Sequence, residues 1–260
     1  MTPIRIAMWS GPRNISTAMM RSFGNRPDTA VVDEPFYAAW LAASGADHPM
    51  RAQVLAAQPT DWAAVAAMLT GPVPGGRAVF YQKHMAHHVT AQTPLGWMAA
   101  CRHAFLIREP EEVLASYIVR RAKVTLEDIG FPQQAALFER EADRLGAAPP
   151  VVDARDVLEN PAGTLRALCD ALGVPFLQAM LSWPPGPRDT DGVWAPAWYD
   201  AVERSTAFAP PRPPITLAEL DPSLRSIAEA ARPIYERLAA HKLTPLPEGE
   251  GGAHGKAMGG

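Results

Sequence analysis

The sequence predicts an α/β fold of three layers, α/β/α, with a central parallel sheet covered by helices on both faces. Short apolar runs rich in β-branched residues alternate with longer segments of helical character along most of the chain. Such alternation is typical of parallel sheets, because a parallel connection needs a crossover and the crossover is usually a helix. The chain has 260 residues, of which 48% are hydrophobic and 20% charged, and this suits one globular domain.

Five segments are predicted as strands, and the loops after them are where a ligand site is expected, since ligands bind at the carboxyl ends of the strands in such folds. The first run stops at Ser10-Gly11-Pro12, and the fourth, His103-Ala104-Phe105-Leu106-Ile107, is the clearest buried strand. The predicted strands are 4–9, 30–32, 78–82, 102–107 and 151–153.

Eight helices are predicted between and after these strands. Pro110 and the acidic residues behind it are typical of a helix start, and Gly173 is typical of a helix end. The segment 183–214 is rich in proline and tryptophan and is predicted to be irregular, and the Gly-rich segment 247–260 is predicted to be a disordered tail behind a domain of residues 1–246. The predicted helices are 16–23, 36–43, 47–58, 62–69, 111–121, 131–145, 161–172 and 220–240.

Charge and cysteine content argue against several classes of protein. A net charge of -3 does not indicate a protein that coats nucleic acid. Cys101 and Cys169 lack a metal-type spacing, which favours a reducing compartment over a disulfide framework. No run approaches the length of a membrane-spanning helix, and the apolar N-terminus is too short for a signal peptide. We therefore expect a cytoplasmic protein that binds neither nucleic acid nor membrane.

The segment 10–17 between the first strand and the first helix has the composition of a phosphate-binding loop. A loop in this place aims backbone N–H groups and a helix N-terminus at an anion. Arg13 adds a positive charge, and Ser16 and Thr17 add hydroxyl donors. The alternative is an ordinary strand–helix turn in which Ser16 is the N-cap.

This loop is not a Walker A motif. When Gly11 is aligned with the first glycine of that motif, Ser16, Thr17 and Ala18 occupy the positions of its Gly, Lys and Ser/Thr. The phosphate-bridging lysine is missing, so hydrolysis of ATP or GTP is poorly supported.

A second candidate site follows the fourth strand. Arg108 stands at the carboxyl end of that strand, and Ser116 lies eight positions later, about two turns into the next helix. An arginine there faces the ligand edge of the sheet, and its fork of donors suits a phosphate held jointly with the serine. The alternative is that Arg108 pairs with a neighbouring glutamate.

Three segments in this order resemble the sulfotransferase family that uses PAPS, 3′-phosphoadenosine 5′-phosphosulfate. Pro12-Arg13-Asn14-Ile15-Ser16-Thr17 is similar to its P-[KR]-S-G-[ST]-[ST] loop. The run from Arg108 to Ser116 fits its R-x-P-x-x-V-x-x-S signature at every position. The run from Asn160-Pro161 to Leu172-Gly173-Val174-Pro175-Phe176 resembles its N-P…L…L-G-x-P-F segment.

The resemblance implies a P-loop NTPase-like fold, PAPS as the sulfuryl donor, and no metal. Pro12, Arg13, Asn14, Ile15, Ser16 and Thr17 would bind the 5′-phosphosulfate, and Arg108 and Ser116 the 3′-phosphate. Arg188 is a weaker candidate for the 3′-phosphate, because the late Arg-Lys-Gly triplet of the family is absent. The loop departs from the family where Asn14-Ile15 replaces Ser-Gly, and we expect altered loop geometry there because Ile15 lacks the backbone freedom of glycine.

Sulfuryl transfer also needs a general base for the proton of the acceptor. Glu34, in Asp33-Glu34-Pro35-Phe36 after the second strand, is favoured, and Asp33 is an alternative. His84, expected just after the third strand, is the other candidate, and Lys83 beside it is expected to contact the sulfonate or the acceptor. Arg13 would stabilise the leaving phosphate. In the competing interpretation, Glu34 is only an acid at a helix start.

Other features leave alternatives open. His84, His87 and His88 lack the further ligands of a metal site, so no metal is expected. Trp194 and Trp198 would line an acceptor pocket or a lid, or belong to the core. We expect a small-molecule or carbohydrate acceptor bearing a hydroxyl or amine, and a homodimer is an open alternative. A P-loop-like nucleotide-dependent kinase, or a non-catalytic nucleotide-binding relative, remains an alternative function.

Overall fold

A computed structural model of the chain describes residues 2–119 and 123–247, and of the predicted tail 247–260 the residues 248–260 lie outside the described residues. A single five-stranded sheet of order β2-β3-β1-β4-β5 forms its centre, and each pair of neighbouring strands is parallel. The predicted α/β class and all five predicted strands are therefore confirmed. The strands are β1 Ile4–Ser10, β2 Thr29–Asp33, β3 Val79–Met85, β4 Arg102–Ile107 and β5 Val151–Asp153.

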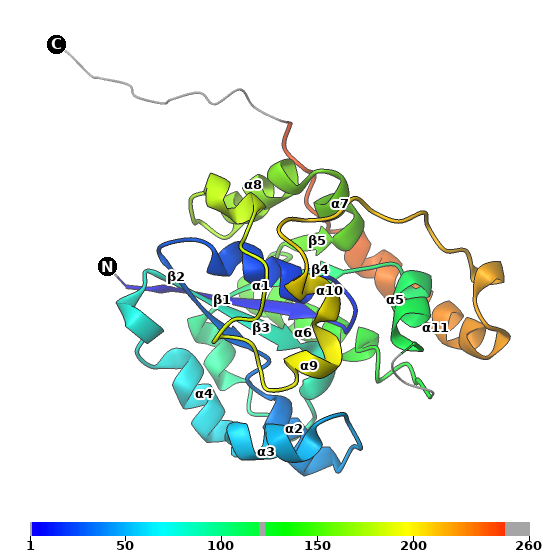
Figure 1. Ribbon diagram of the computed structural model, residues 1–260, viewed down its shortest axis with the longest axis horizontal. Coiled ribbons are helices and arrows are strands. Elements are labelled where there is room, and N and C mark those ends of the chain that lie inside the picture. Colours follow the sequence, from blue (N-terminus) through cyan, green and yellow to red (C-terminus); the bar gives the residue numbers. More distant parts are fainter. Residues whose placement is uncertain (1, 120–122, 248–260) are drawn as a thin grey trace.

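Helices cover both faces of the sheet, as predicted for three layers (Figure 1). The helices are α1 Ser16–Gly24, α2 Tyr37–Ser44, α3 Arg51–Ala57, α4 Trp62–Thr70, α5 Pro110–Tyr117, α6 Phe131–Leu145, α7 Ala154–Glu159, α8 Pro161–Ala171, α9 Ala195–Trp198, α10 Asp200–Glu203 and α11 Pro222–Ala239. Short 3₁₀ segments lie at Pro74–Gly76, Ala86–His88, Gly96–Ala100, Gln178–Leu181 and Leu217–Glu219. Within the described residues, no helix has both the length and the apolar character needed to cross a membrane.

The two faces of the sheet carry separate apolar cores, because successive side chains of a strand point to opposite faces. From β1, Ile6 and Met8 pack with α1, α7 and α8 on one face. Ala7 and Trp9 pack with α4, α6 and α11 on the other face. In Figure 1 the helices α1 and α8 lie above the strands and α4 lies below them.

The strand order places the loop after β1 in the middle of the carboxyl edge. β1 pairs with β3 on one side and with β4 on the other. From β1 the chain first builds β3 and β2 on one side and later β4 and β5 on the other. Open α/β sheets bind ligands at such a topological switch point.

Some predicted bounds were wrong. β3 continues to Met85, so Lys83 and His84 lie inside the strand and not after it, because β1 and β2 pair with this polar stretch and keep it extended. Helix α5 ends at Tyr117, earlier than predicted, and positions 120 and 121 of the predicted helix lie outside the described residues. The proline-rich segment 183–214 is mostly irregular but contains α9 and α10.

Candidate functional site

The loop after β1 adopts a tight left-handed turn. Arg13 and Ile15 both have positive φ, of 62° and 55°. The expectation that Ile15 would alter the loop was wrong in this respect, since Ile15 lies in the left-handed region that glycine favours, at φ 55° and ψ 15°. That conformation costs a non-glycine residue about 1–2 kcal/mol. The Ile15 side chain packs against the core beneath α1, and this contact offsets the strain.

Contacts with neighbouring segments fix the loop in place. The Nδ2 group of Asn14, which is 2% exposed, donates to the carbonyl of Leu106 at 3.2 Å. Gly11 passes so close to another segment that a Cβ built on it would lie 2.4 Å from the carbonyl oxygen of Ile129. Only glycine fits at this position.

The N-terminus of α1 has no side-chain cap. Ile15 is the N-cap and Ser16 is the first helical residue, so the alternative in which Ser16 caps a simple turn is not observed. The first N–H groups of a helix have no partner inside the helix. An uncapped N-terminus at the centre of the carboxyl edge is suited to an anion.

The two predicted phosphate-binding elements meet at Arg13. The Nε of Arg13 donates to the Oγ of Ser116 on α5 at 2.8 Å. One terminal nitrogen of Arg108, just beyond β4, donates to the backbone carbonyl of Arg13 at 2.7 Å. Arg108 also pairs with Glu112 at 2.8 Å. A pair with a neighbouring glutamate was the alternative interpretation of Arg108 from the sequence. Glu112 bonds Arg155 as well. Arg108 thus bonds both Glu112 and the loop after β1, and Arg13, Arg108 and Ser116 form one cationic corner.

A buried ionic cluster lies at the ends of β2 and β3. The ammonium group of Lys83 donates to Asp33 Oδ1 at 2.8 Å, to Glu34 Oε1 at 2.6 Å and to the Tyr199 hydroxyl at 2.8 Å. Tyr199 in turn donates to Asp33 Oδ2 at 2.6 Å. Because an ammonium has three N–H bonds, Lys83 is fully satisfied by these groups.

Glu34 is held in a strained conformation, with φ of 39°. Its backbone N–H donates to the carbonyl of Lys83 at 2.9 Å, and its carbonyl accepts from Gln58 at 3.3 Å. Helix α2 begins at Tyr37 and has no acid in its first turn, so Glu34 is not the helix-start acid of the competing interpretation. Strain of this kind persists only where surrounding contacts impose it, and it is concentrated at functional sites.

The cluster shifts the pKa values of both Glu34 and Lys83 upward, and the main cause differs between the two groups. Burial raises the pKa of Glu34 to about 7, although the Lys83 ammonium opposes the rise. Burial also acts to lower the pKa of Lys83, but the carboxylates of Asp33 and Glu34 outweigh it and hold that pKa well above its ordinary value. Lys83 is thus a permanent cation, and Glu34 is a carboxyl group that titrates near neutral pH.

His84 points to the other face of the sheet from Lys83, because the two are consecutive in β3. It is 1% exposed and stacks on Trp9, with ring centroids 4.5 Å apart. Burial lowers its pKa well below the ordinary value. Glu34 instead lies close to the imidazole of His88, whose Nε2 is 4.0 Å from Glu34 Oε2.

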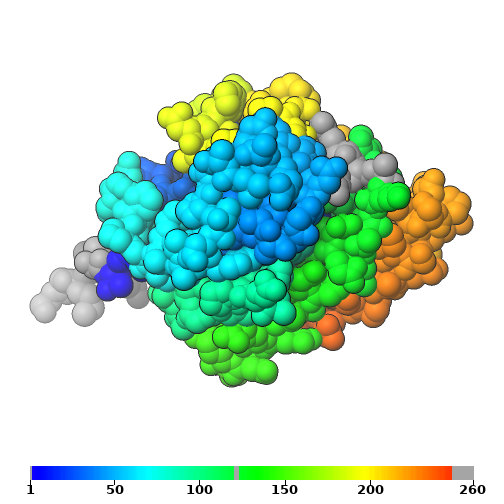
Figure 2. Space-filling view, turned by 90° about the horizontal axis from the view of Figure 1, so that it is seen from below, coloured from blue at the N-terminus to red at the C-terminus, as the bar shows by residue number. Residues whose placement is uncertain are grey.

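The structure does not bring the remaining candidates to the cationic corner. Arg188 lines a pocket beside α1 and β2. Trp194 is 1% exposed and belongs to a small core with Tyr37 and Trp40, while Trp198 is partly buried against it. Figure 2 shows the segments that form this core, blue for the region of α2 and α3 and yellow for α9 and α10, in contact on one face.

Tyr199 was missed at the sequence level. It lies 166 positions from Asp33, in a segment expected to be irregular, and no motif marks it. The backbone N–H of Gly192 also donates to Asp33 Oδ2, at 3.1 Å. The only sequence signal was the concentration of aromatic residues from 183 to 199. Across residues 2–119 and 123–247, no group of three or more His, Cys, Asp or Glu side chains is arranged to hold a metal ion.

Comparisons with known proteins give matches over most of the chain. A family model described as "Sulfotransferase domain" matches residues 4–242. Branched-chain-amino-acid aminotransferase-like protein 1 of Arabidopsis thaliana is 36% identical over 240 residues, which cover 92% of this chain and 42% of that protein. Branched-chain-amino-acid aminotransferase-like protein 2 of the same organism is 33% identical over 238 residues, which cover 91% of this chain and 41% of that protein. The chain thus spans less than half the length of these curated relatives.

Solved structures share the fold. The sulfotransferase domain from the curacin biosynthetic pathway superposes with a TM-score of 0.54 at 17% identity, over 94% of this chain and 99% of that domain. A sulfotransferase from Alicyclobacillus acidocaldarius gives a TM-score of 0.54 at 15% identity, over 92% and 96% of the two chains.

Proposed function

Because this chain belongs to the sulfotransferase domain family, we propose that it transfers a sulfuryl group from PAPS to a hydroxyl or amine of a small-molecule or carbohydrate acceptor. The observation that carries this proposal is the cationic corner of Arg13, Arg108 and Ser116 beside the uncapped N-terminus of α1. We also propose a cytoplasmic location, which the two free, buried cysteines support.

The residues present fit a donor with two separate anionic groups. The loop from Pro12 to Thr17, with the first N–H groups of α1, would hold the 5′-phosphosulfate. Arg108 and Ser116 would hold the 3′-phosphate, because both lie beside this loop at Arg13 and carry hydrogen-bond donors. When bound, PAPS supplies the sulfuryl group, which carries less charge than a phosphoryl group and has less need of a metal. Arg13 would stabilise the negative charge left on the phosphate.

Glu34 is the general base in this proposal, and its role is to take the proton of the acceptor. Both oxygens of Asp33 already accept hydrogen bonds, from Lys83, Tyr199 and Gly192. Glu34 accepts from Lys83 through Oε1, and its Oε2 lies 4.0 Å from Nε2 of His88, beyond hydrogen-bond distance. His84 is enclosed by aromatic rings on the opposite face. Lys83 would orient the Glu34 carboxylate.

Calorimetric binding of adenosine 3′,5′-bisphosphate and of ATP, with and without magnesium, tests the proposal. We expect metal-independent binding of the bisphosphate that Arg108→Ala weakens by about tenfold or more, because a charge-assisted hydrogen bond contributes roughly 1.5–3 kcal/mol. Ser116→Ala should weaken it less. Arg225→Ala is the control, since this arginine bonds backbone carbonyls before α11.

Binding confined to magnesium-ATP would replace the proposal with a kinase, the alternative that shares this fold. Absence of binding to either nucleotide by the folded protein would favour the non-catalytic relative. Equal weakening by Arg108→Ala and Arg225→Ala would contradict the assignment of the corner.

A further inference from the structure

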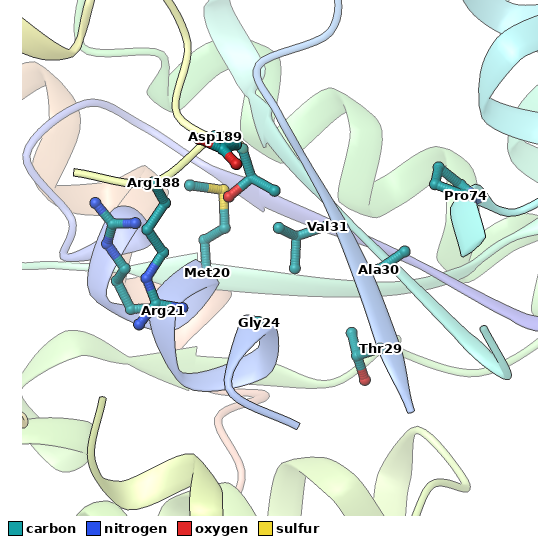
Figure 3. A pocket seen from close by; sticks show the side chains of 10 residues that line it. Met20, Arg21, Gly24, Thr29, Ala30, Val31, Pro74, Arg188 and Asp189 are labelled. Atoms are coloured by element: carbon teal, nitrogen blue, oxygen red, sulfur yellow. The ribbon is translucent and has the colours of Figure 1, made fainter. Parts of the chain in front are cut away.

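A pocket with two arginines lies outside the site described above. It is a cavity of about 330 Å³ between α1, the start of β2 and the segment that carries Arg188. Its mouth reaches the surface, because Pro74, Asp189 and Thr190 on its rim are exposed. In Figure 3 the Arg21 and Arg188 side chains lie next to each other at one end of the pocket.

Each arginine has a buried N–H group that is not used. Arg21 is 1% exposed and pairs through one terminal nitrogen with Asp191 at 2.6 Å. Its other terminal nitrogen, and Nη2 of Arg188, are buried and have no hydrogen-bond partner among the described residues. Oδ1 of Asp191 is buried without a partner as well, so two donor nitrogens face one unpaired acceptor oxygen among the described residues. Buried polar groups are normally satisfied, and this excess of donors indicates a missing acceptor.

The charges around the pocket also indicate an anion. Asp191 Oδ2 accepts from Arg21 and from the backbone N–H of Arg188, so Arg21 and Asp191 form an ion pair and, within the described part of the chain, Arg188 is the arginine without a bonded carboxylate. Asp189 is exposed to solvent at the rim. Burial and the neighbouring Arg21 lower the pKa of Arg188, which means that its positive charge lacks full compensation where it stands.

The opposite wall is apolar. Ala30, Val31 and Pro74 line it, with Thr29 at one side, and Met20 lies nearer the two arginines (Figure 3). A bare inorganic ion would leave this wall in contact with water. An anionic head attached to a short aliphatic body would satisfy both ends of the pocket.

The pocket is distinct from the proposed nucleotide site. It adjoins Thr29, Ala30 and Val31, in the first half of β2, whereas Glu34 follows the carboxyl end of that strand. Three residues of strand from Val31 to Glu34 span about 10 Å. None of Arg13, Arg108 and Ser116 lines the pocket.

We propose that this pocket binds a small organic anion, a carboxylate or other oxyanion on a short aliphatic body, with Arg21 and Arg188 as donors to the anionic head. The inference does not rest on sulfuryl transfer. We expect modest affinity, because Asp189 and Asp191 partly offset the two arginines.

Isovalerate and its neutral counterpart isovaleramide are suitable probes, titrated by NMR against the full chain. We expect isovalerate to bind, isovaleramide to bind at least about tenfold more weakly, and acetate and sulfate to bind more weakly than isovalerate, because they lack the aliphatic body. Arg188→Gln should weaken isovalerate by about tenfold or more. Val31→Phe, which fills the cavity from the apolar wall, should do the same.

Matched controls separate this pocket from the nucleotide site. Arg108→Ala and Arg225→Gln should leave isovalerate binding unchanged, and Arg188→Gln should leave binding of adenosine 3′,5′-bisphosphate unchanged. The proposal is overturned if isovalerate does not bind, if the amide binds equally well, or if Arg108→Ala abolishes binding while folded Arg188→Gln does not.

Discussion

Glu34 is the side chain whose surroundings have the most direct effect on the chemistry proposed for it, because they set its pKa. Its pKa is raised to about 7, first by burial and then by Asp33, against the pull of Lys83. A base acts in its deprotonated form, so kcat/KM should rise about tenfold per pH unit below pH 7 and level off above it. Glu34→Gln should lower kcat by roughly 10²–10⁴-fold and remove this rise. An unchanged pH profile in Glu34→Gln would assign the base elsewhere.

In the proposed mechanism Tyr199 positions the ionic cluster, and this effect can be separated from its effect on stability. Its hydroxyl bonds Asp33, Lys83 and Trp194. Tyr199→Phe should lower the free energy of unfolding by about 1–3 kcal/mol, because buried partners lose a hydrogen bond. It should also change kcat and shift the pH profile.

Tyr235→Phe is a matched control for that experiment. Tyr235 on α11 also donates to a carboxylate at a strand end, Asp153 Oδ2 at 2.7 Å, but far along the sheet on β5. We expect a comparable loss of stability in chemical denaturation with kcat and its pH profile unchanged. Parallel effects on kcat in both variants would show that Tyr199 acts through stability alone.

Among the structural elements, the loop after β1 is the least tolerant of change. Gly11→Ala would place a Cβ 2.4 Å from the backbone carbonyl oxygen of Ile129, so the backbone at residue 11 or at residue 129 has to move. We expect a loss of about 1–3 kcal/mol in the free energy of unfolding, and weaker binding of adenosine 3′,5′-bisphosphate.

Gly96→Ala is the control, because a Cβ there meets no atom within 4 Å and φ is not positive. It should change stability by less than about 0.5 kcal/mol. Full bisphosphate affinity in Gly11→Ala would show that the close approach of the 129 carbonyl does not shape the loop.

In the molecule as a whole, α11 contacts segments that are far apart in the sequence. Arg232 pairs with Glu109 and Glu111 beside α5, and Tyr235 reaches β5. Leu238, which is fully buried on this helix, packs in the core below the sheet. Leu238→Ala should cost about 2–5 kcal/mol of unfolding free energy.

Leu145→Ala is its counterpart, since Leu145 is 49% exposed at the end of α6. Its effect should stay within about 0.5 kcal/mol. Denaturation followed by far-UV circular dichroism and by tryptophan fluorescence checks both, and Leu238→Ala should shift the two signals together. A shift in only one signal would mean that α11 unfolds separately.

The sequence predicted the architecture well because the strands are apolar runs bounded by turn residues, as in 102–107. It placed Arg108 and Ser116 on neighbouring elements because one strand and the helix that follows fix both, and in the structure each bonds Arg13. It failed where long-range contacts decide the outcome. Pairing with β1 and β2 kept Lys83 and His84 within β3, and core packing allowed Ile15 a left-handed turn. Tyr199 reaches Asp33 through a fold that no local pattern specifies.

The complete satisfaction of Lys83 has a consequence for any ligand. An oxygen atom of a donor or acceptor can reach its ammonium group only by displacing Asp33, Glu34 or Tyr199. For a ligand that contacts Lys83 directly, observed affinity equals intrinsic affinity multiplied by the fraction of molecules in which one of these bonds is open. If that fraction is about one in a hundred, binding is weakened about a hundredfold. Selectivity then favours ligands able to replace the lost bond.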